Sequence, residues 1–291
     1  MLAKRANTII IVFLAILNAA LFSFNLNEWN RYSLSDARIA DITALLARNG
    51  VDLRADLPRR FAPLKTMTLE LYPFTAEASD GLTALFFAPD ETPVSSTAFG
   101  WETLEYKGKS LTFTAQGFRF EDLDDGGGPG DRDTAFRAAG AAAMSASALG
   151  DGVTLTLYSE KGSDGDYTFE YRGVYRSATV YSSFLRVRTR GGKVVAERGN
   201  FYVPKGFGGE RDVYAPDEAL YTLSRELRHM FGARAGEPPI IVSAVDLVYL
   251  VEDNGGLAAG EVGAEPYYMF TVSLLDEPIF VNAFTNEAKR A

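Results

Sequence analysis

Few residues in this chain have the chemistry that a catalytic site requires. It contains no cysteine and one histidine, His229. Thiol catalysis, thiolate metal sites and disulfides are therefore excluded, and histidine acid–base catalysis would depend on one residue. His229 lies in a stretch with helical periodicity, where a surface or half-buried position is expected. Asp246 and Glu265 could form a carboxylate pair, but only their charge suggests it. The serine pairs Ser95-Ser96 and Ser182-Ser183 lack the glycines of a nucleophile elbow.

The glycine-rich stretches also lack the spacing of ligand-binding motifs. The acidic segment Glu121–Asp133 (EDLDDGGGPGDRD) has no carboxylate in its centre, where an EF-hand calcium loop needs ligands. Gly126–Gly130 is not followed by the Lys-Ser/Thr of a phosphate-binding loop. We interpret this region as a solvated loop. Together, these patterns predict that the protein is not an enzyme and has no catalytic residue, no cofactor and no metal site.

The charge of the chain limits its partners. It has 29 basic and 38 acidic residues and a formal net charge of −9. Nucleic-acid binding needs clustered lysine and arginine that neutralise phosphates. The acidic balance therefore predicts no nucleic-acid partner.

The longest apolar run lies close to the N-terminus, from Thr8 to Phe24. Extended to residues 6–26, it reaches roughly the 20 residues that a membrane-spanning helix needs. A cleaved signal peptide and a buried core helix are the alternatives, but no small-x-small cleavage site follows the run. We expect an uncleaved anchor. Lys4 and Arg5 precede it, so the positive-inside rule places residues 1–5 in the cytoplasm and the bulk of the chain outside.

One face of this predicted anchor could contact another helix. Ala15, Ala19 and Ser23 are spaced four apart, a pattern of small residues that lets two membrane helices approach closely. Asn18 is a carboxamide in the same run, and it could form a hydrogen bond across the helix interface. The alternative is that alanine is simply common in such spans. We predict these four residues as the contact site for a partner helix.

The remaining chain predicts an α+β fold. Helices are expected over residues 33–49, from Asp131 or Asp133 to about 149, and from Pro216 to the residue before Gly232. Strands are expected at 66–72, 82–88, 101–106, 110–115, 153–158, 167–175, 179–189, 193–203, 240–251, 267–274 and 279–284. Helices and strands do not alternate regularly, which indicates antiparallel sheets rather than a parallel α/β sheet. The prediction is an N-terminal transmembrane helix followed by two antiparallel-sheet lobes, each covered by helices, at 33–150 and 151–291.

Several stretches resemble the YycI family and the related YycH proteins. The N-terminal KRANTIIIVFLAILNAALF is followed by a helix ending in ARNGVDL. The second half contains GVYRSATVYSSFLRVRTRGGKV, PDEAL, IIVSAVDLVYLVED, EPYYMFTV and IFVNAFTNE. These motifs cover about half of the chain. They do not distinguish the YycI type from the YycH type.

The resemblance implies a single-pass protein in the cell membrane of a Gram-positive-type bacterium, with an extracytoplasmic domain. Family members associate with one another and with the sensor histidine kinase of a two-component system, and their membrane helices contribute to that contact. We therefore expect a membrane-anchored regulator whose partners are a sensor kinase and a YycH-type protein. The alternative is an extracytoplasmic module that binds or senses a ligand without kinase contact.

Overall fold

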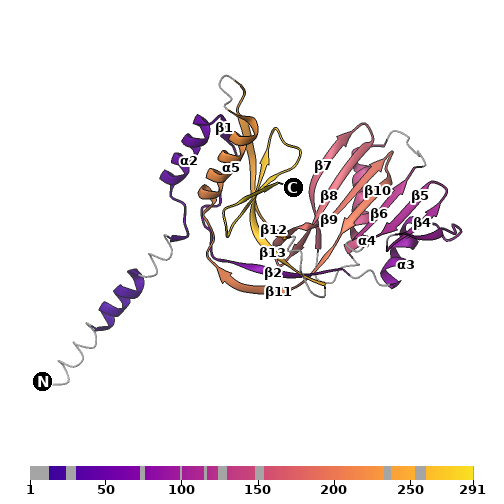
Figure 1. Cartoon of the computed structure of the whole chain (residues 1–291), viewed down its shortest axis with the longest axis horizontal. Coiled ribbons are helices and arrows are strands. Elements are labelled where there is room, and N and C mark those ends of the chain that lie inside the picture. The colour runs from indigo at the N-terminus through magenta and orange to yellow at the C-terminus, as the bar shows by residue number, and fades with distance from the viewer. Residues whose placement is uncertain are drawn as a thin grey trace. The chain divides into compact units, whose positions relative to one another are not determined.

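The computed structural model describes residues 13–23, 31–72, 76–98, 100–114, 117–123, 130–147, 154–232, 237–252 and 260–290. The chain divides into two compact units (Figure 1). Unit 1 comprises residues 1–64, 211–246 and 268–291, and unit 2 comprises residues 65–210 and 247–267. Both units combine helices with strands, so the protein has the predicted mixed α+β fold.

Two helices of unit 1 follow from their local sequence. Helix α2 (Asp36–Arg48) begins after Ser35, whose Oγ accepts a hydrogen bond from the backbone nitrogen of Arg38 at 3.3 Å. It ends at Asn49, and Gly50 follows with a φ of 73°. Helix α5 (Pro216–Phe231) has proline in its first turn and ends at Gly232, which has a φ of 68°. The sequence predicted both helices and their terminating residues.

The sheet of unit 1 packs against these helices. Its strands are β1 (Val51–Leu53), β14 (Ile279–Asn282), β15 (Ala288–Arg290) and parts of β12 (Ile240–Val251) and β13 (Glu261–Val272). Strand β1 pairs with β12 in parallel, whereas β14 and β15 are antiparallel. Leu220, Leu223 and Leu227 of α5 are buried in one core with Phe270. The leucine face of α5 therefore closes the core of unit 1.

Unit 2 is built on a larger sheet with the strand order β7-β8-β9-β10-β6-β5-β4-β3 (Figure 1). All neighbours in this series are antiparallel. Strand β12 pairs in parallel with the beginning of β9, and β13, β2 and β11 follow in order. The strands are β2 (Leu64–Leu71), β3 (Val94–Ala98), β4 (Trp101–Tyr106), β5 (Lys109–Phe113), β6 (Gly117–Asp122), β7 (Thr154–Ser163), β8 (Asp166–Tyr175), β9 (Ala178–Arg190), β10 (Lys193–Asn200) and β11 (Tyr202–Arg211).

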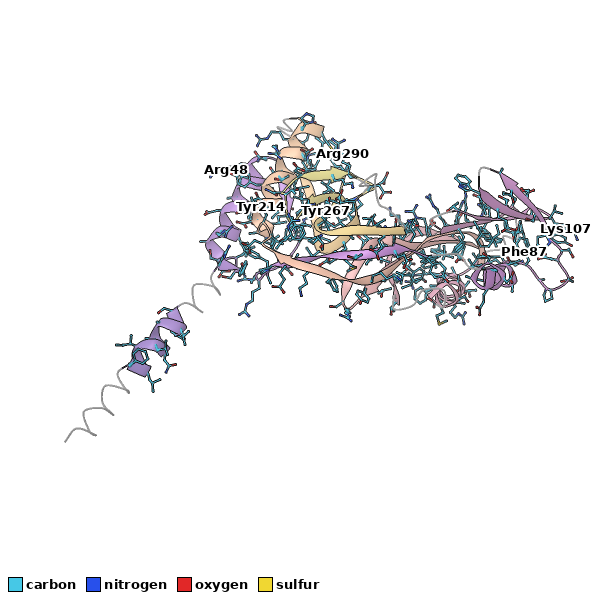
Figure 2. The ribbon with its side chains drawn as sticks, turned by 60° about the horizontal axis from the view of Figure 1, so that its bottom comes forward. Arg48, Phe87, Lys107, Tyr214, Tyr267 and Arg290 are labelled. Carbon is cyan, nitrogen blue, oxygen red and sulfur yellow. The ribbon has the colours of Figure 1, made fainter. Side chains whose placement is uncertain are left out.

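Helices α3 (Ala76–Phe86) and α4 (Arg132–Ser147) contribute to the core on one face of this sheet. Helix α4 presents alanines, and Ala135 and Ala139 are fully buried against aromatic side chains such as Phe169. The predicted β4–β5 hairpin is present, and Lys107 lies at its tip (Figure 2). Lys107 and Gly108 have φ values of 43° and 85°, as a type I′ turn requires.

Some predicted elements were wrong. Residues 82–88 were expected to form a strand, but α3 covers Ala76–Phe86. Ala78 and Leu82, four residues apart, are the buried positions of this helix, so its apolar period is helical. The predicted strand 193–203 is two strands, β10 and β11, and strands β3 and β6 were not predicted. The sheets are mainly antiparallel, but β12 makes two parallel pairs, with β1 and β9.

The two units also differ from the predicted lobes. The expected boundary near residue 150 lies outside the described residues, and β6, α4, β7 and β8 on either side of it all belong to unit 2. Unit 1 combines segments from both ends of the chain. Strands β12 and β13 each contribute residues to both units, so the division cuts across strands as well as loops.

Only part of the predicted anchor is described. Residues 13–23 are helical and exposed along their whole length, whereas residues 1–12 and 24–30 lie outside the described residues. Within the part of the chain that the structure describes, no helix has the length and apolar character to cross a membrane.

Candidate functional site

The residues predicted to contact a partner helix all lie in the helical segment 13–23. Successive residues of an α-helix are about 100° apart, so Ala15, Ala19 and Ser23 follow one another along one face, and Asn18 lies at its edge. Ser23 Oγ donates a hydrogen bond to the carbonyl oxygen of Ala19 at 2.9 Å, so its hydroxyl is satisfied within the helix. The surface that remains for a partner consists of small side chains and one carboxamide.

A second candidate site, not predicted from the sequence, is a cleft within unit 2. It has a volume of about 280 Å³ and lies between helices α3 and α4 and the sheet. Most of its lining is apolar, and its polar side chains are Lys109, Asp122, Ser145 and Glu197. The apolar lining residues are Leu85, Phe86, Phe120, Ala138, Ala141, Ala142 and Val194. An apolar cleft with a few polar groups is the usual form of a small-molecule site.

Glu197 is the most unusual residue of the cleft. It lies on β10 between Phe120 of β6 and Val187 of β9, in a row of side chains that faces α4. It is only 1% exposed, and neither oxygen of its carboxyl has a hydrogen-bond partner in the described part of the protein. Burial raises the pKa of Glu197 to about 8, because desolvation disfavours the charged form. At neutral pH, Glu197 is therefore mainly a neutral carboxylic acid.

Tyr171 of β8 belongs to the same buried face of the sheet. Its hydroxyl is also buried and has no partner among the described residues. Burial raises the pKa of Tyr171, and the charges of Glu160 and Glu197 add to this effect. Glu197 and Tyr171 are thus buried titratable groups of unit 2 that the described fold does not satisfy, although such groups are normally hydrogen-bonded.

The polar groups nearer the mouth are tied to their neighbours. Lys109 Nζ donates to both carboxylate oxygens of Glu91, at 3.0 and 2.9 Å. This contact is the main reason why the pKa of the Glu91 carboxyl is lowered. The rings of Phe86 and Phe120 stack with their centroids 4.1 Å apart. One wall of the cleft is therefore a flat aromatic surface, beside a lysine whose charge is paired with Glu91.

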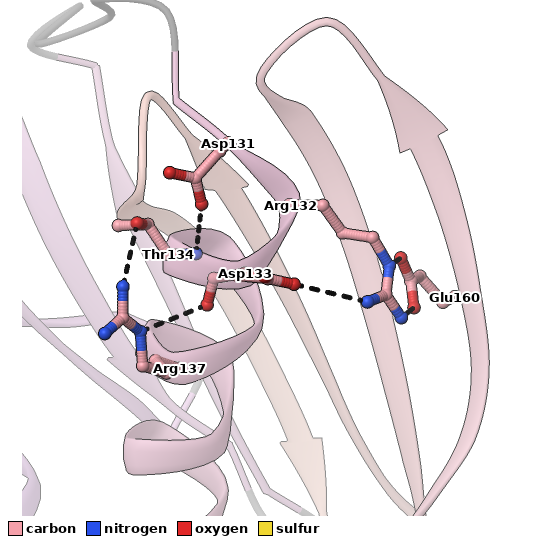
Figure 3. A network of polar contacts seen from close by, with 6 residues as sticks. All are labelled: Asp131, Arg132, Asp133, Thr134, Arg137 and Glu160. Carbon is pink, nitrogen blue, oxygen red and sulfur yellow. Dashed lines mark hydrogen bonds and ion pairs between the residues drawn. The ribbon is translucent and has the colours of Figure 1, made fainter.

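Helix α4, which forms the opposite wall, is fixed at its N-terminus by a polar network (Figure 3). Asp131 Oδ1 accepts a hydrogen bond from the backbone nitrogen of Thr134 at 2.6 Å and caps the helix, as predicted. This bond is the first cause of the lowered pKa of Asp131. Arg132 makes two bonds of 2.6 Å to Glu160 of β7. These contacts anchor α4 to the sheet.

Close backbone packing also positions this end of α4. A Cβ atom added to Gly130 would lie 2.6 Å from backbone atoms of Gly191 and Gly192. The β9–β10 turn therefore approaches the residue before the helix more closely than any side chain would allow. Gly130, the described residue of the glycine-rich stretch 126–130, therefore acts as a packing residue.

The other candidates for chemistry have structural surroundings. His229 is exposed in the last turn of α5, as predicted. Ser182 Oγ accepts a hydrogen bond from the backbone nitrogen of Val251 at 3.0 Å. Among the described residues, no three histidine, aspartate or glutamate side chains lie close enough to hold a metal ion.

Sequence reasoning missed Glu197 because of a β-bulge. Strict alternation along residues 193–200 would place Val194 and Glu197 on opposite faces of the strand. The pairing of β10 with β9 shifts between Val194 and Ala196, and Val194 and Glu197 both line the cleft. The only signal in the sequence was an acidic residue between Val195 and Gly199, which does not distinguish an inward from an outward position.

Comparisons with known proteins assign no family. No protein-family model matches the chain, so the YycI and YycH resemblance is not supported by such a match, and no curated protein matches either. Among solved structures, the chain is similar to the Bacillus megaterium YpeB C-terminal domain, with 13% sequence identity and a TM-score of 0.40. The similarity covers 74% of this chain and 97% of that one. It is too distant to assign a function.

Proposed function

We propose that this protein is a membrane-anchored regulator that modulates a two-component sensor histidine kinase through protein–protein contacts. The bulk of the chain would lie outside the cytoplasm, and residues 6–26 would form the anchor. The observation that supports this proposal is the exposed apolar helix at residues 13–23.

This helix carries large apolar side chains that have no cover within the described part of the chain. Phe13, Ile16 and Phe22 are 64–65% exposed, and Leu14, Leu17 and Leu21 are 43–53% exposed. Apolar surface in water is unfavourable by about 25 cal/mol for each Å². A lipid bilayer removes this penalty, which favours membrane insertion over exposure to water.

Within a bilayer, the face formed by Ala15, Ala19 and Ser23 is the part of the helix best suited to a protein partner. Small residues let two backbones approach, and the packing of close backbones drives helix association in lipid. Asn18 would strengthen such a contact because its carboxamide is poorly solvated by lipid. The large side chains at positions 13, 17 and 21 would face the lipid.

The kinase is named from the sequence resemblance, which also suggests a YycH-type protein as a second partner. Contacts outside the membrane would be made by the two folded units. The regulatory effect would then depend on the anchor, because the membrane contact fixes the position of these units beside the kinase.

Site-specific cross-linking tests this proposal. A photoreactive residue is placed at Asn18 of the full-length protein in bacterial membranes, and captured proteins are identified by mass spectrometry. Leu17 is the matched control, because it lies about 200° around the helix from Ala19. We expect capture of a sensor kinase from position 18 and much weaker capture from position 17. Equal capture from both positions, or no kinase from position 18, would contradict the proposal.

A second experiment tests regulation rather than proximity. Replacing Ala15 and Ala19 by leucine should block close helix approach, whereas Leu17→Ile should not. Kinase autophosphorylation is measured in vesicles that contain the kinase with the wild-type or variant protein. We expect the double substitution to abolish the effect of the protein on the kinase and the control to retain it. An unchanged effect in the double variant would place regulation elsewhere.

A further inference from the structure

The cleft of unit 2 contains a polar group with no use in the fold itself. A carboxyl group transferred from water to the protein interior loses its hydrogen bonds to water, and folded proteins normally replace them. Both oxygens of Glu197 lack such a replacement in the described structure. Since Glu197 lines a cleft that opens to solvent between α3 and α4, a ligand could supply the missing partner.

The shape of the cleft restricts the body of this ligand. Its volume of about 280 Å³ is at the lower limit for small-molecule sites, so one ring with a short chain would fill it. Phe86 and Phe120 form one wall, and the buried Ala142 belongs to the opposite wall on α4. Ala141 and Ser145, which are exposed, lie at the mouth. These surfaces suit a flat apolar group.

The charges around the cleft determine the head group. Lys109 is engaged by Glu91, which leaves the acidic groups Asp122 and Glu197 as the other titratable side chains of the lining. An anionic head group would have no lining cation to pair with except Lys109, whose charge is already paired with Glu91. A cationic head group could pair with Glu197, and a charge-assisted hydrogen bond in a desolvated site is stronger than a neutral one.

We propose that this cleft binds a small molecule with a ring-sized apolar body and a primary amine. The ammonium group donates a hydrogen bond to the carboxylate of Glu197, and the apolar body packs between Phe86 and α4. Glu197 releases its proton to solvent as the ligand binds, so an ion pair replaces a neutral acid. This inference does not depend on the kinase contact.

The proposal predicts a particular pH dependence. Lys109 on β5 and Asp122 on β6 line the same cleft as Glu197, and the lining residues of α3 and α4 carry no titratable group. Tyr171 on β8 is close enough for its pKa to be raised by the charge of Glu197 and by that of Glu160 on β7. Amines of this type keep their proton up to about pH 10, as lysine does. The affinity for the amine should therefore increase as pH increases, by up to about tenfold for each pH unit, and level off above about pH 8, where Glu197 is already ionised.

Isothermal titration of the full-length protein with phenethylamine tests the ligand class, with 2-phenylethanol as a probe that has the same ring but no charge. We expect phenethylamine to bind at least tenfold more tightly than 2-phenylethanol at pH 8. We also expect Glu197→Gln to weaken phenethylamine binding at least tenfold and to remove its rise with pH. Equal affinities of the wild-type protein for the two probes would overturn the proposal, and so would unchanged amine binding by Glu197→Gln.

Two substitutions on α4 test the location without altering the carboxyl group. Ala141→Phe fills the mouth of the cleft, whereas Met144→Phe changes a side chain that is 72% exposed and does not line it. We expect Ala141→Phe to abolish phenethylamine binding and Met144→Phe to preserve it. Because both positions are exposed, neither variant depends on repacking the core. Equal binding by the two variants would exclude this cleft as the site.

Discussion

The two units use helices of opposite character to cover their sheets. In unit 1, α5 buries large side chains, including Leu220 and Leu223, which have no exposed surface. In unit 2, α4 buries alanines, including Ala135 and Ala139. Leucine fills the space between a helix and a sheet by itself. Alanine lets the helix lie closer to the sheet, and the remaining space beside α3 forms the cleft.

The units also treat buried polar groups differently. In unit 1, Asn282 Oδ1 accepts hydrogen bonds from the backbone nitrogens of Phe284 and Thr285, at 2.7 and 3.1 Å. The hydroxyl of Tyr268 donates to the carbonyl oxygen of Tyr214 at 2.9 Å. Unit 1 has one buried side-chain oxygen without a partner among the described residues, Oδ1 of Asn286, which does not titrate. The buried titratable side chains without a partner among the described residues, Glu197 and Tyr171, both lie in unit 2.

This difference indicates a division of roles. The core of unit 1 is packed with large apolar side chains, and two surface clefts of this unit, of about 420 and 600 Å³, are lined mainly by polar side chains. Unit 2 has a mainly apolar cleft lined by an acid without a hydrogen-bond partner among the described residues, and this acid reduces stability unless a ligand compensates. The following changes test the comparison, in order of decreasing expected effect.

The largest effect is expected from a cavity in unit 1. Leu223→Ala should lower the free energy of unfolding by about 2–5 kcal/mol, because the filled core cannot collapse around the missing atoms. Urea unfolding measures the loss, and hydrogen exchange resolved by peptide assigns it to α2 and α5. Tyr221→Ala is the control on the same helix, since Tyr221 is 59% exposed. A loss equal to that of the control would show that unit 1 is not tightly packed.

The alanine face of α4 should be sensitive to a larger side chain rather than to a smaller one. Ala139→Leu should destabilise the protein by about 1–3 kcal/mol, because a fully buried alanine against the sheet leaves no room for three more carbon atoms. Exchange should increase in peptides of α4 and β9. A stabilised variant would mean that α4 lies over an unfilled space along its whole length.

Removing the acid of unit 2 should increase stability. Glu197→Met has a similar volume and no unsatisfied polar atoms, so at pH 5 it should raise the free energy of unfolding by about 1–3 kcal/mol. Urea unfolding of both proteins without ligand measures the difference. Destabilisation by this change would show that the Glu197 carboxyl has a favourable partner.

The same residue should make the stability of unit 2 depend on pH. The pKa of Glu197 is about 8 in the folded protein, compared with 4.5 for an unperturbed glutamate. Between these values the unfolded chain binds fewer protons, so stability falls as pH rises. Relative to Glu197→Gln, the wild-type protein should lose about 1 kcal/mol for each pH unit between pH 5 and 8. A constant difference over this range would exclude the raised pKa.

The smallest effects are expected at the helix caps. Ser35 makes a long capping bond of 3.3 Å to α2, so Ser35→Ala should cost about 0.5–1 kcal/mol. Asp131 caps α4 at 2.6 Å, and its lowered pKa means that the cap weakens as pH falls. Asp131→Ala should therefore lower the urea midpoint more than Ser35→Ala at pH 7, and this excess should shrink in acid.

Local chemistry made several elements predictable. Ser35, Asn49 and Gly50 mark the ends of α2, and Pro216 and Gly232 mark those of α5. Such capping and turn signals act through hydrogen bonds and φ angles within a few residues, so they can be read without the rest of the fold. The small-residue face of the N-terminal helix was also visible from spacing alone, and its function remains a proposal.

Tertiary structure decided what local signals could not. Part of α3 was predicted as a strand, because the apolar residues of LTALFF fit both a helical and a strand period. The burial of Ala78 and Leu82 on one face selects the helix. The two units combine segments distant in sequence, which no boundary signal could reveal.

The sequence by itself determined the absence of thiol chemistry, the acidic charge, the apolar N-terminal run and the helices with clear caps. The burial of Glu197 required the whole of unit 2. Its side chain is enclosed by residues of β6, β9 and α4, and a bulge in its own strand sets the face toward which it points. A glutamate in a sequence carries no information about its solvation. Only the arrangement of the surrounding strands and helices removes water and changes its pKa.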